Sequence, residues 1–281
     1  MTRGDGDYAL MQNAWNAQWS HNRYRAYYPW TIGGAVWSMY DYNRGCCDNI
    51  CYSGLADLFR LPKFGLLYFR TQMKEGTFTP AGPMTYEVFI NSHWLEGSSD
   101  TLQVYGNVDE VKLQLNGRVI ARQYPDDKPS TSEYVSRPDG GNAENIDFPP
   151  FTFFNVNWER GELKAIGYKD GKAVAEHVVR TPGAVEAMDI TYFESGVSAS
   201  CRDLLIVYVN LKDLQGTGCF GENNREVKLE VLQGGELRGP ATIKAEAGVA
   251  SFLVATTDSP MLVLKAVSGN LETMRKLKLK K

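Results

Sequence analysis

The run Ile32–Met39 constrains the fold more than any other stretch of the chain. It holds small and apolar residues with a single serine, and it lies between Pro29 and the turn residues Asn43-Arg44-Gly45. An unbroken apolar run of this length, bounded by turn signals, predicts a β-strand that is buried on both faces. Such strands are typical of parallel sheets in α/β folds, so the surrounding segments decide which fold it belongs to.

Helices are predicted on both sides of this strand. Residues 6–28 have apolar side chains at helical spacing, Asp7 can cap the start, and Pro29 ends the run. A second helix is predicted from residue 63 to about 74, with Pro62 at a favoured first-turn position. Helix, strand, loop and helix make one and a half βα units, which cannot close a barrel alone.

Aromatic and polar residues gather at the C-terminal end of the predicted strand, where parallel barrels bind their ligands. A sugar ring needs a flat apolar face together with carboxylate and amide partners for its hydroxyls. Trp37 with Asp41 and Asn43 supplies both, and Tyr40 lies beside them. The alternative is that Trp37 and Tyr40 are core aromatics and that Asp41 caps a turn.

The pattern changes after Gly76, where short runs alternate with a period of two. Asn116-Gly117 and Asp170-Gly171 predict two tight hairpins. About seven strands are predicted over 76–183, the number found in an immunoglobulin-like sandwich. Residues 123–150 are too long for an ordinary hairpin, and we expect a mobile loop there, with covering of the barrel segment as the alternative.

A second boundary is predicted at Thr181-Pro-Gly183. Beyond it, Leu204–Leu211 and three further apolar runs predict another sandwich over 184–281. The final Met274–Lys281 alternates Leu with Lys like an edge strand, whose charges protect the edge rather than bind nucleic acid. The predicted fold is therefore mainly β: a partial (β/α)8-barrel tail over 1–75, followed by two immunoglobulin-like β-sandwich domains, 76–183 and 184–281.

Composition and charge exclude some classes of partner. Hydrophobic residues make up 43% and charged residues 22%, which is ordinary for a globular protein, and the formal net charge is −3. This charge gives no electrostatic reason to expect nucleic acid or an anionic membrane as a partner. No apolar run approaches the ~20 residues of a membrane span, and the first residues lack a hydrophobic signal core.

The five cysteines do not predict a metal site. Cys46, Cys47 and Cys51 lie close together, but a zinc site would need a fourth ligand that no nearby histidine supplies. We expect free or partly paired thiols, and no metal or cofactor.

Several stretches together make the chain resemble the C-terminal portion of family-2 glycoside hydrolases, the β-galactosidase, β-glucuronidase and agarase-related group. Residues 30–42 (WTIGGAVWSMYDY) look like the final barrel strand, and 53–57 with 61–63 like the segment that leads into the last barrel helix. Residues 104–117 (VYGNVDEVKLQLNG) look like the domain that follows the barrel, and 203–213 like part of the further C-terminal sandwich.

The resemblance implies a retaining enzyme with two catalytic glutamates held ~5 Å apart. No glutamate occurs before Glu75, so neither is placed in this chain. We therefore expect a fragment or truncated product of an enzyme acting on β-linked galactosides or related polysaccharides, itself inactive. The alternative is a non-catalytic carbohydrate-binding or scaffold module. The parent enzyme is expected to be periplasmic or secreted.

The expected partner is a carbohydrate, bound at Trp37, Tyr40, Asp41 and Asn43. An unclosed barrel segment would also leave apolar side chains uncovered, namely Trp15, Trp19 and Val36. We therefore expect either a homodimer or association with the missing part of the barrel.

Overall fold

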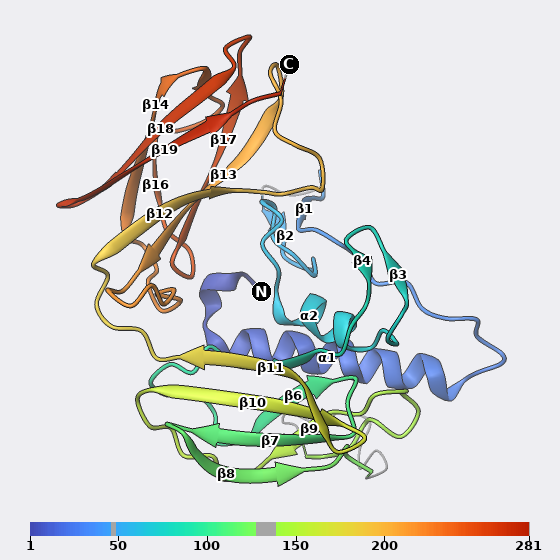
Figure 1. The fold of residues 1–281 in the computed structure, drawn as a ribbon. Helices are drawn as coiled ribbons and strands as arrows, with labels where there is room; N and C mark the ends of the chain where they lie inside the picture. The colour runs from blue at the N-terminus through green and yellow to red at the C-terminus, as the bar shows by residue number, and fades with distance from the viewer. Residues whose placement is uncertain (46–48, 128–138, 281) are drawn as a thin grey trace. The chain divides into compact units, whose positions relative to one another are not determined.

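The computed structural model of this chain describes residues 1–45, 49–127 and 139–280 and divides into two compact units, 1–181 and 182–281. The first unit begins with a short 3-10 turn, η1 (Arg3–Asp5), and the long helix α1 (Asp7–Ala26); α2 (Phe64–Thr71) follows (Figure 1). Both helices lie where the sequence predicts them. No helix among the described residues has the length and apolar character that a membrane span requires.

Two antiparallel sheets form most of the first unit. One has the order β5-β6-β9 and the other β11-β10-β7-β8. Their bounds are β5 (Val88–Ile90), β6 (Leu102–Gly106), β7 (Glu110–Leu115), β8 (Arg118–Gln123), β9 (Phe151–Phe153), β10 (Glu162–Lys169) and β11 (Lys172–Arg180). The sheets bury one apolar core between them, with Val104 and Phe151 from the first sheet packed with Leu113 and Leu163 from the second. Buried residues alternate with less buried ones along β7 and β10, so that each strand directs one row of apolar side chains toward the other sheet.

The two predicted hairpin turns are confirmed. β7 and β8 are joined through Asn116 and Gly117, and β10 and β11 through Asp170 and Gly171. All four turn residues have positive φ angles, between 49° and 79°. Asparagine, aspartate and glycine tolerate this conformation better than other residues, which is why these dipeptides predict tight hairpins.

The helices share a core with the three-stranded sheet rather than forming one of their own. Leu10 and Met11 of α1 and Tyr68 of α2 pack with Phe89 of β5 and Tyr105 of β6. Helix α2 also contributes to a row of aromatic contacts: the Phe64 ring centroid lies 5.2 Å from Phe89 and 4.8 Å from the His93 ring. Burial of these rings ties residues 1–75 to the sheet that follows them.

Residues 141–147, in the second half of the 123–150 excursion, are bound to α1. Gln18 donates hydrogen bonds to the carbonyls of Gly141 and Asn142, and Arg25 donates to the Asp147 carboxylate at 2.7 Å. Residues 141–147 thus lie against one face of the helix, as the alternative of a covering segment predicts, and the mobility of the excursion stays a prediction. Residues 128–138 lie outside the described part of the chain.

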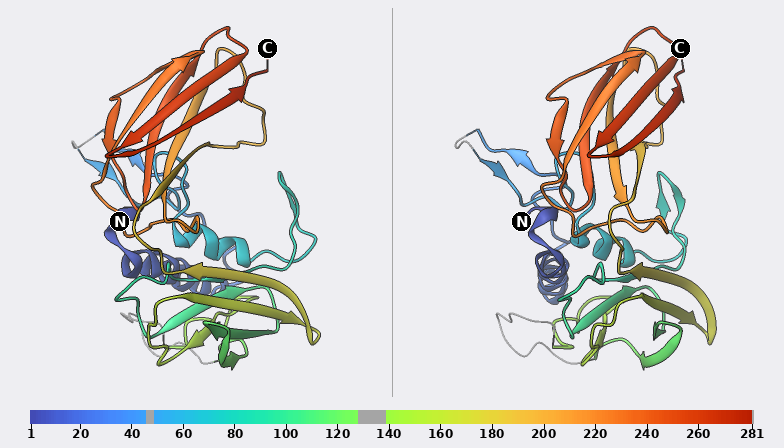
Figure 2. Two further views of the ribbon diagram at one scale, coloured as in Figure 1. Left: turned by 60° about the vertical axis from the view of Figure 1, so that its left-hand side comes forward. Right: turned by 90° about the vertical axis from the view of Figure 1, so that its left-hand side faces the viewer.

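The second unit is a separate pair of antiparallel four-stranded sheets (Figure 2). The first sheet, in the order β12-β13-β17-β15, contains β12 (Ala187–Tyr192), β13 (Leu204–Lys212), β15 (Gly235–Leu237) and β17 (Val249–Thr256). The second, in the order β16-β14-β18-β19, contains β14 (Glu226–Gln233), β16 (Thr242–Lys244), β18 (Met261–Ser268) and β19 (Leu271–Lys278). Val207 and Val254 of one sheet pack with Leu229 and Leu264 of the other in a single core.

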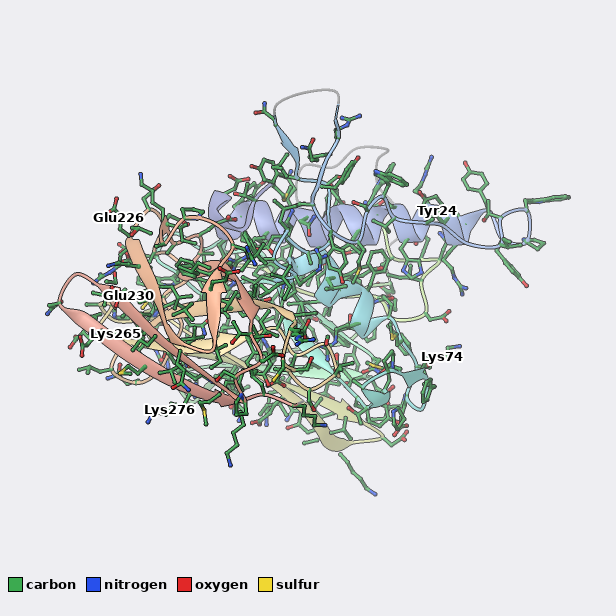
Figure 3. All side chains as sticks on the ribbon, turned by 90° about the horizontal axis from the view of Figure 1, so that it is seen from above. Tyr24, Lys74, Glu226, Glu230, Lys265 and Lys276 are labelled. Carbon is green, nitrogen blue, oxygen red and sulfur yellow. The ribbon has the colours of Figure 1, made fainter. Side chains whose placement is uncertain are left out.

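Strand β19 lies at the edge of its sheet, as its alternating sequence predicts. Lys276 is exposed and its neighbour Leu277 packs against the core. Figure 3 labels charged side chains of this sheet on β14, β18 and β19. Lys265 pairs with Glu272 at 2.9 Å. The charged outer face disfavours edge-to-edge pairing with another chain.

The predicted strand at 32–39 is not present. These residues form no strand, and Ile32 and Val36 are exposed. A strand of this composition needs neighbours on both sides and on both faces, and the described residues supply only one short contact, at its C-terminal end. The expected exposure of Trp15 is also wrong: this side chain is buried, and Trp19 is partly buried.

The mainly β character of the chain is confirmed. The barrel origin of residues 1–75, the immunoglobulin-like identity of the sandwiches and the three-domain division at 75/76 and 183/184 stay predictions. Four short strands complete the first unit: β1 (Tyr42–Asn43) pairs with β2 (Ile50–Cys51), and β3 (Phe78–Thr79) with β4 (Gly82–Pro83).

Candidate functional site

The four predicted site residues lie on one segment, 37–43. Backbone hydrogen bonds to Leu55 and Ala56, which come later in the chain, hold this segment. The backbone N–H of Leu55 donates to Ser38 O and that of Ala56 to Met39 O, each at 3.0 Å. The N–H of Asp41 in turn donates to Ala56 O at 3.0 Å, so that Tyr40 and Ala56 form a parallel bridge. Residues 38–41 therefore have a fixed backbone, in contrast to the exposed residues before them.

Asp41 is buried, with 4% of the residue exposed. Its Oδ1 accepts hydrogen bonds from Lys63 Nζ at 2.7 Å and from the backbone N–H of Gly54 at 2.8 Å. The Lys63 side chain is completely buried, and its Nζ also donates to Tyr52 O at 3.3 Å. Two buried charges of opposite sign offset part of each other's desolvation, and hydrogen bonds to backbone groups complete that compensation.

Trp37 has the opposite environment, with 76% of the residue exposed. The indole Nε1–H donates to the Tyr42 hydroxyl at 2.7 Å, and the two rings meet edge to face with centroids 6.0 Å apart and planes at 86°. The peptide bond between Trp37 and Ser38 is cis. Because one edge of the indole is held while the side chain is largely exposed, the ring has apolar surface available for a ligand.

Tyr40 and Asn43 lie between these extremes. The Arg60 guanidinium carbon lies 3.8 Å from the centroid of the partly buried Tyr40 ring, a cation–π contact. Asn43 is exposed, and its Oδ1 accepts a hydrogen bond from the Gly45 N–H at 2.8 Å. The Asn43 amide nitrogen is placed to interact with solvent or a ligand.

The structure thus groups the predicted residues differently from the sequence. Trp37 contacts Tyr42, which is not one of the four predicted site residues, and Asp41 contacts Lys63 and Gly54. The proximity of Tyr42 could have been found from its place in the aromatic cluster that ends the 30–42 stretch. The pairing with Lys63 could not, because Lys63 follows Asp41 by 22 positions and no periodic pattern relates the two.

A cavity of about 480 Å³ lies beside this segment, between α1 and residues 28–36. Its walls include His21, Tyr24 and Arg25 of α1 and, on the other side, Ile32 and Val36. Figure 3 shows Tyr24 toward the C-terminal end of the helix. The volume lies within the range of small-molecule sites, and the walls combine apolar and hydrogen-bonding groups.

The His21 side chain in this cavity is half-buried. Its Nδ1 lies 2.9 Å from the hydroxyl of Tyr68, and burial, with the nearby Arg25 guanidinium second, lowers its pKa. Neutral imidazole is therefore favoured there, as a hydrogen-bonding group rather than a cation.

Within the described ranges, no group of His, Cys, Asp and Glu side chains has a metal-binding arrangement. The described cysteines Cys51, Cys201 and Cys219 are free thiols. Cys46 and Cys47, which complete the cysteine cluster of the sequence, lie outside the described residues.

Residues 97–175, within the first unit, match a family described as a domain of unknown function (DUF4982). Over 258 residues the chain is 31% identical to a β-galactosidase from Thermoanaerobacter pseudethanolicus, and the match covers 85% of this chain and 32% of that protein. It is 27% identical over 207 residues to a β-glucuronidase from Formosa agariphila, covering 72% of this chain and 18% of the relative. The chain thus spans a third or less of these relatives.

Solved structures share the fold. A β-glucuronidase from glycoside hydrolase family 2 superposes with a TM-score of 0.73 at 20% identity, over 96% of this chain and 27% of that one. A β-glycosidase from Bacteroides vulgatus superposes with a TM-score of 0.72 at 16% identity, over 93% of this chain and 32% of that one. The sequence and structure comparisons confirm the resemblance to the C-terminal portion of family-2 glycoside hydrolases.

Proposed function

Because the chain resembles the C-terminal portion of family-2 glycoside hydrolases, we propose that it forms one wall of a saccharide site for β-linked galactosides or related polysaccharides. The parent reaction is retaining hydrolysis with two catalytic glutamates, which lie on chain outside these residues. The 1–281 chain itself binds the sugar without cleaving it.

The observation that carries this proposal is the exposed, edge-held indole of Trp37. An aromatic ring with an accessible apolar surface covers the C–H groups of a sugar ring, and an indole fixed at one edge loses little side-chain entropy on binding. The exposed Asn43 amide is the proposed partner for a hydroxyl, and a contact by Tyr40, whose ring is stacked by Arg60, stays a prediction. A direct contact by Asp41 stays a prediction, which its burial against Lys63 does not favour.

The exposed segment 27–36, before Trp37, supports association with the rest of such an enzyme. Its large apolar side chains are all exposed; they are Tyr27, Tyr28, Trp30, Ile32 and Val36. Contiguous exposed apolar side chains mark surfaces that another part of a protein covers. A second chain of the same sequence is the other candidate for this role.

The test combines binding and turnover. Titration of 1–281 with methyl β-galactoside and with methyl β-glucuronide, followed by tryptophan fluorescence, should give a saturable change that Trp37→Ala removes. Aryl β-glycosides should not be hydrolysed. Turnover that disappears in Asp41→Ala would contradict the proposal, because it would identify a catalytic carboxylate within this chain.

The second candidate function is a non-catalytic carbohydrate-binding or scaffold module. The absence of a glutamate before Glu75 in the sequence favours it for the isolated chain. The two functions differ in one measurement: addition of the remaining part of a relative to 1–281 should restore hydrolysis only if the chain completes an enzyme site.

A further inference from the structure

Lys63 is an unusual residue to find completely buried, because lysine is rarely removed from water unless its charge is paired. It is the N-cap residue of α2, where its backbone N–H donates to Leu55 O at 2.9 Å. Its side chain reaches back 22 residues to Asp41. One residue therefore connects the start of α2 with the segment that carries the predicted site.

Two buried ion pairs lie in this part of the structure, and they differ in what they connect. Arg3 pairs with Asp57 at 2.9 Å, and Asp57 also accepts from the N–H groups of Phe59 and Leu61. None of these groups belongs to residues 37–43. The Asp41–Lys63 pair, in contrast, includes a residue of this segment, because Asp41 lies between Tyr40 and Tyr42.

The position of Trp37 depends on that of Tyr42, which holds the indole edge. Tyr42 is on β1, whose ladder within the described ranges is the two-residue pairing with β2, Tyr42 opposite Cys51. A ladder of two residues is too short to be stable without further support. The nearest such support is Asp41, whose backbone N–H donates to Ala56 O and whose side chain accepts from Gly54 and Lys63.

We infer that Lys63 is a positioning residue of the candidate saccharide site: beyond the backbone bonds that hold residues 38–41, it fixes the Asp41 side chain at the start of β1 and so orients Tyr42 and, through it, Trp37. The inference rests on the proposed function only for the identity of the ligand. Asp41 then serves as the link between Lys63 and β1 and does not contact the sugar. Without the Asp41–Lys63 pair, Trp37 is still present but its indole no longer has one fixed orientation.

The test uses the indole N–H resonances of the full 1–281 chain in a ¹H–¹⁵N spectrum, without sugar. Trp37→Phe assigns the Trp37 resonance. The Trp94 indole donates to Glu159 O at 3.0 Å inside the sandwich and serves as the internal reference. In Lys63→Met combined with Asp41→Asn, the Trp37 resonance should move toward the position of a solvent-exposed indole, and the Trp94 resonance should stay.

The double variant is used because Lys63→Met alone leaves a buried carboxylate without its partner and can prevent folding. The matched control is Arg3→Met with Asp57→Asn, which removes the other buried pair and should leave the Trp37 resonance unmoved. An unmoved Trp37 resonance in the folded Asp41/Lys63 double variant would overturn the inference. Loss of the Trp94 resonance as well would also overturn it, since the pair would then serve folding in general.

A sugar titration of the same samples separates this inference from the proposed function. If methyl β-galactoside and methyl β-glucuronide leave the Trp37 resonance of the unchanged protein unaffected, the proposed function fails, while the sugar-free spectra still decide the role of Lys63. If a sugar binds, its affinity should fall at least as far in the double variant as in Trp37→Phe.

Discussion

The Asp7 carboxylate at the start of α1 lies 3.5 Å from Nδ1 of His93, which belongs to the loop after β5. The same carboxylate accepts hydrogen bonds from the hydroxyls of Ser92 and Ser98 and from the backbone N–H of His93. Burial lowers the pKa of His93 to about 4, against the opposing effect of Asp7. The helix and the sandwich therefore meet at a histidine that is neutral in the folded protein.

This arrangement predicts a loss of stability in acid. Above the unfolded-state pKa of about 6.5, His93 is neutral in both states. Between that pKa and the folded-state value of about 4, the unfolded chain binds a proton that the folded protein does not, so the free energy of unfolding falls as the pH falls. The contribution of His93 reaches about 3 kcal/mol at the lower end of this window and is constant below it.

Urea unfolding at a series of pH values measures this effect. His93→Gln should flatten the dependence between these two pKa values relative to the unchanged protein. His177, whose pKa burial also lowers, remains in the variant, so a residual slope is expected. Identical slopes for the two proteins would show that His93 is not the responsible group.

Trp37→Ala should separate binding from stability. Since the side chain is 76% exposed, the free energy of unfolding should change by less than about 0.5 kcal/mol. Saccharide binding should weaken by roughly 1–3 kcal/mol if the indole stacks on the sugar. Denaturant unfolding and fluorescence titration on one preparation give both values, and a loss of several kcal/mol in stability would instead indicate a core residue.

Gly234→Ala is expected to destabilise the second unit. Gly234 has a φ of +80°, and a Cβ there would lie only 2.0 Å from the carbonyl oxygen of Met261. Gly216→Ala is the matched control, because Gly216 has a φ of +82° but no atom within 4 Å of the added Cβ. Both variants have the same backbone strain, of about 1–2 kcal/mol, and the clash should cost Gly234→Ala about 1–3 kcal/mol more. Equal midpoints in thermal unfolding would contradict the predicted clash.

The described cysteines should differ in reactivity. Hydrogen bonding to the Ser53 hydroxyl, and secondly to that of Tyr42, lowers the pKa of the Cys51 thiol, whereas burial raises the pKa of Cys219 to about 11. Only the thiolate reacts with an alkylating reagent, so iodoacetamide should modify Cys51 well before Cys219 at about pH 8. Peptide mass spectrometry over time measures the order. Earlier modification of Cys219 would show that this cysteine opens to solvent.

The elements that local sequence determines were predictable, and those that depend on distant partners were not. The Asn116-Gly117 hairpin and α1 follow from turn chemistry and helical spacing that a short window contains. The run at 32–39 has the composition of a buried strand, but a strand exists only with neighbours, and the described residues offer none along most of its length. The same limit applies to the site, where the burial of Asp41 depends on a lysine from the next helix.

The shared core of α1, α2 and the β5–β6 sheet determines where this chain can be cut or recombined. Expression of 76–281 alone would leave Phe89 and Tyr105 without the helices that bury them, so such a truncation should be insoluble. A junction near Thr181 cuts between two units that each have their own core. When genes recombine, we expect residues 1–181 to stay together, whereas the C-terminal sandwich, 182–281, can be replaced by another domain.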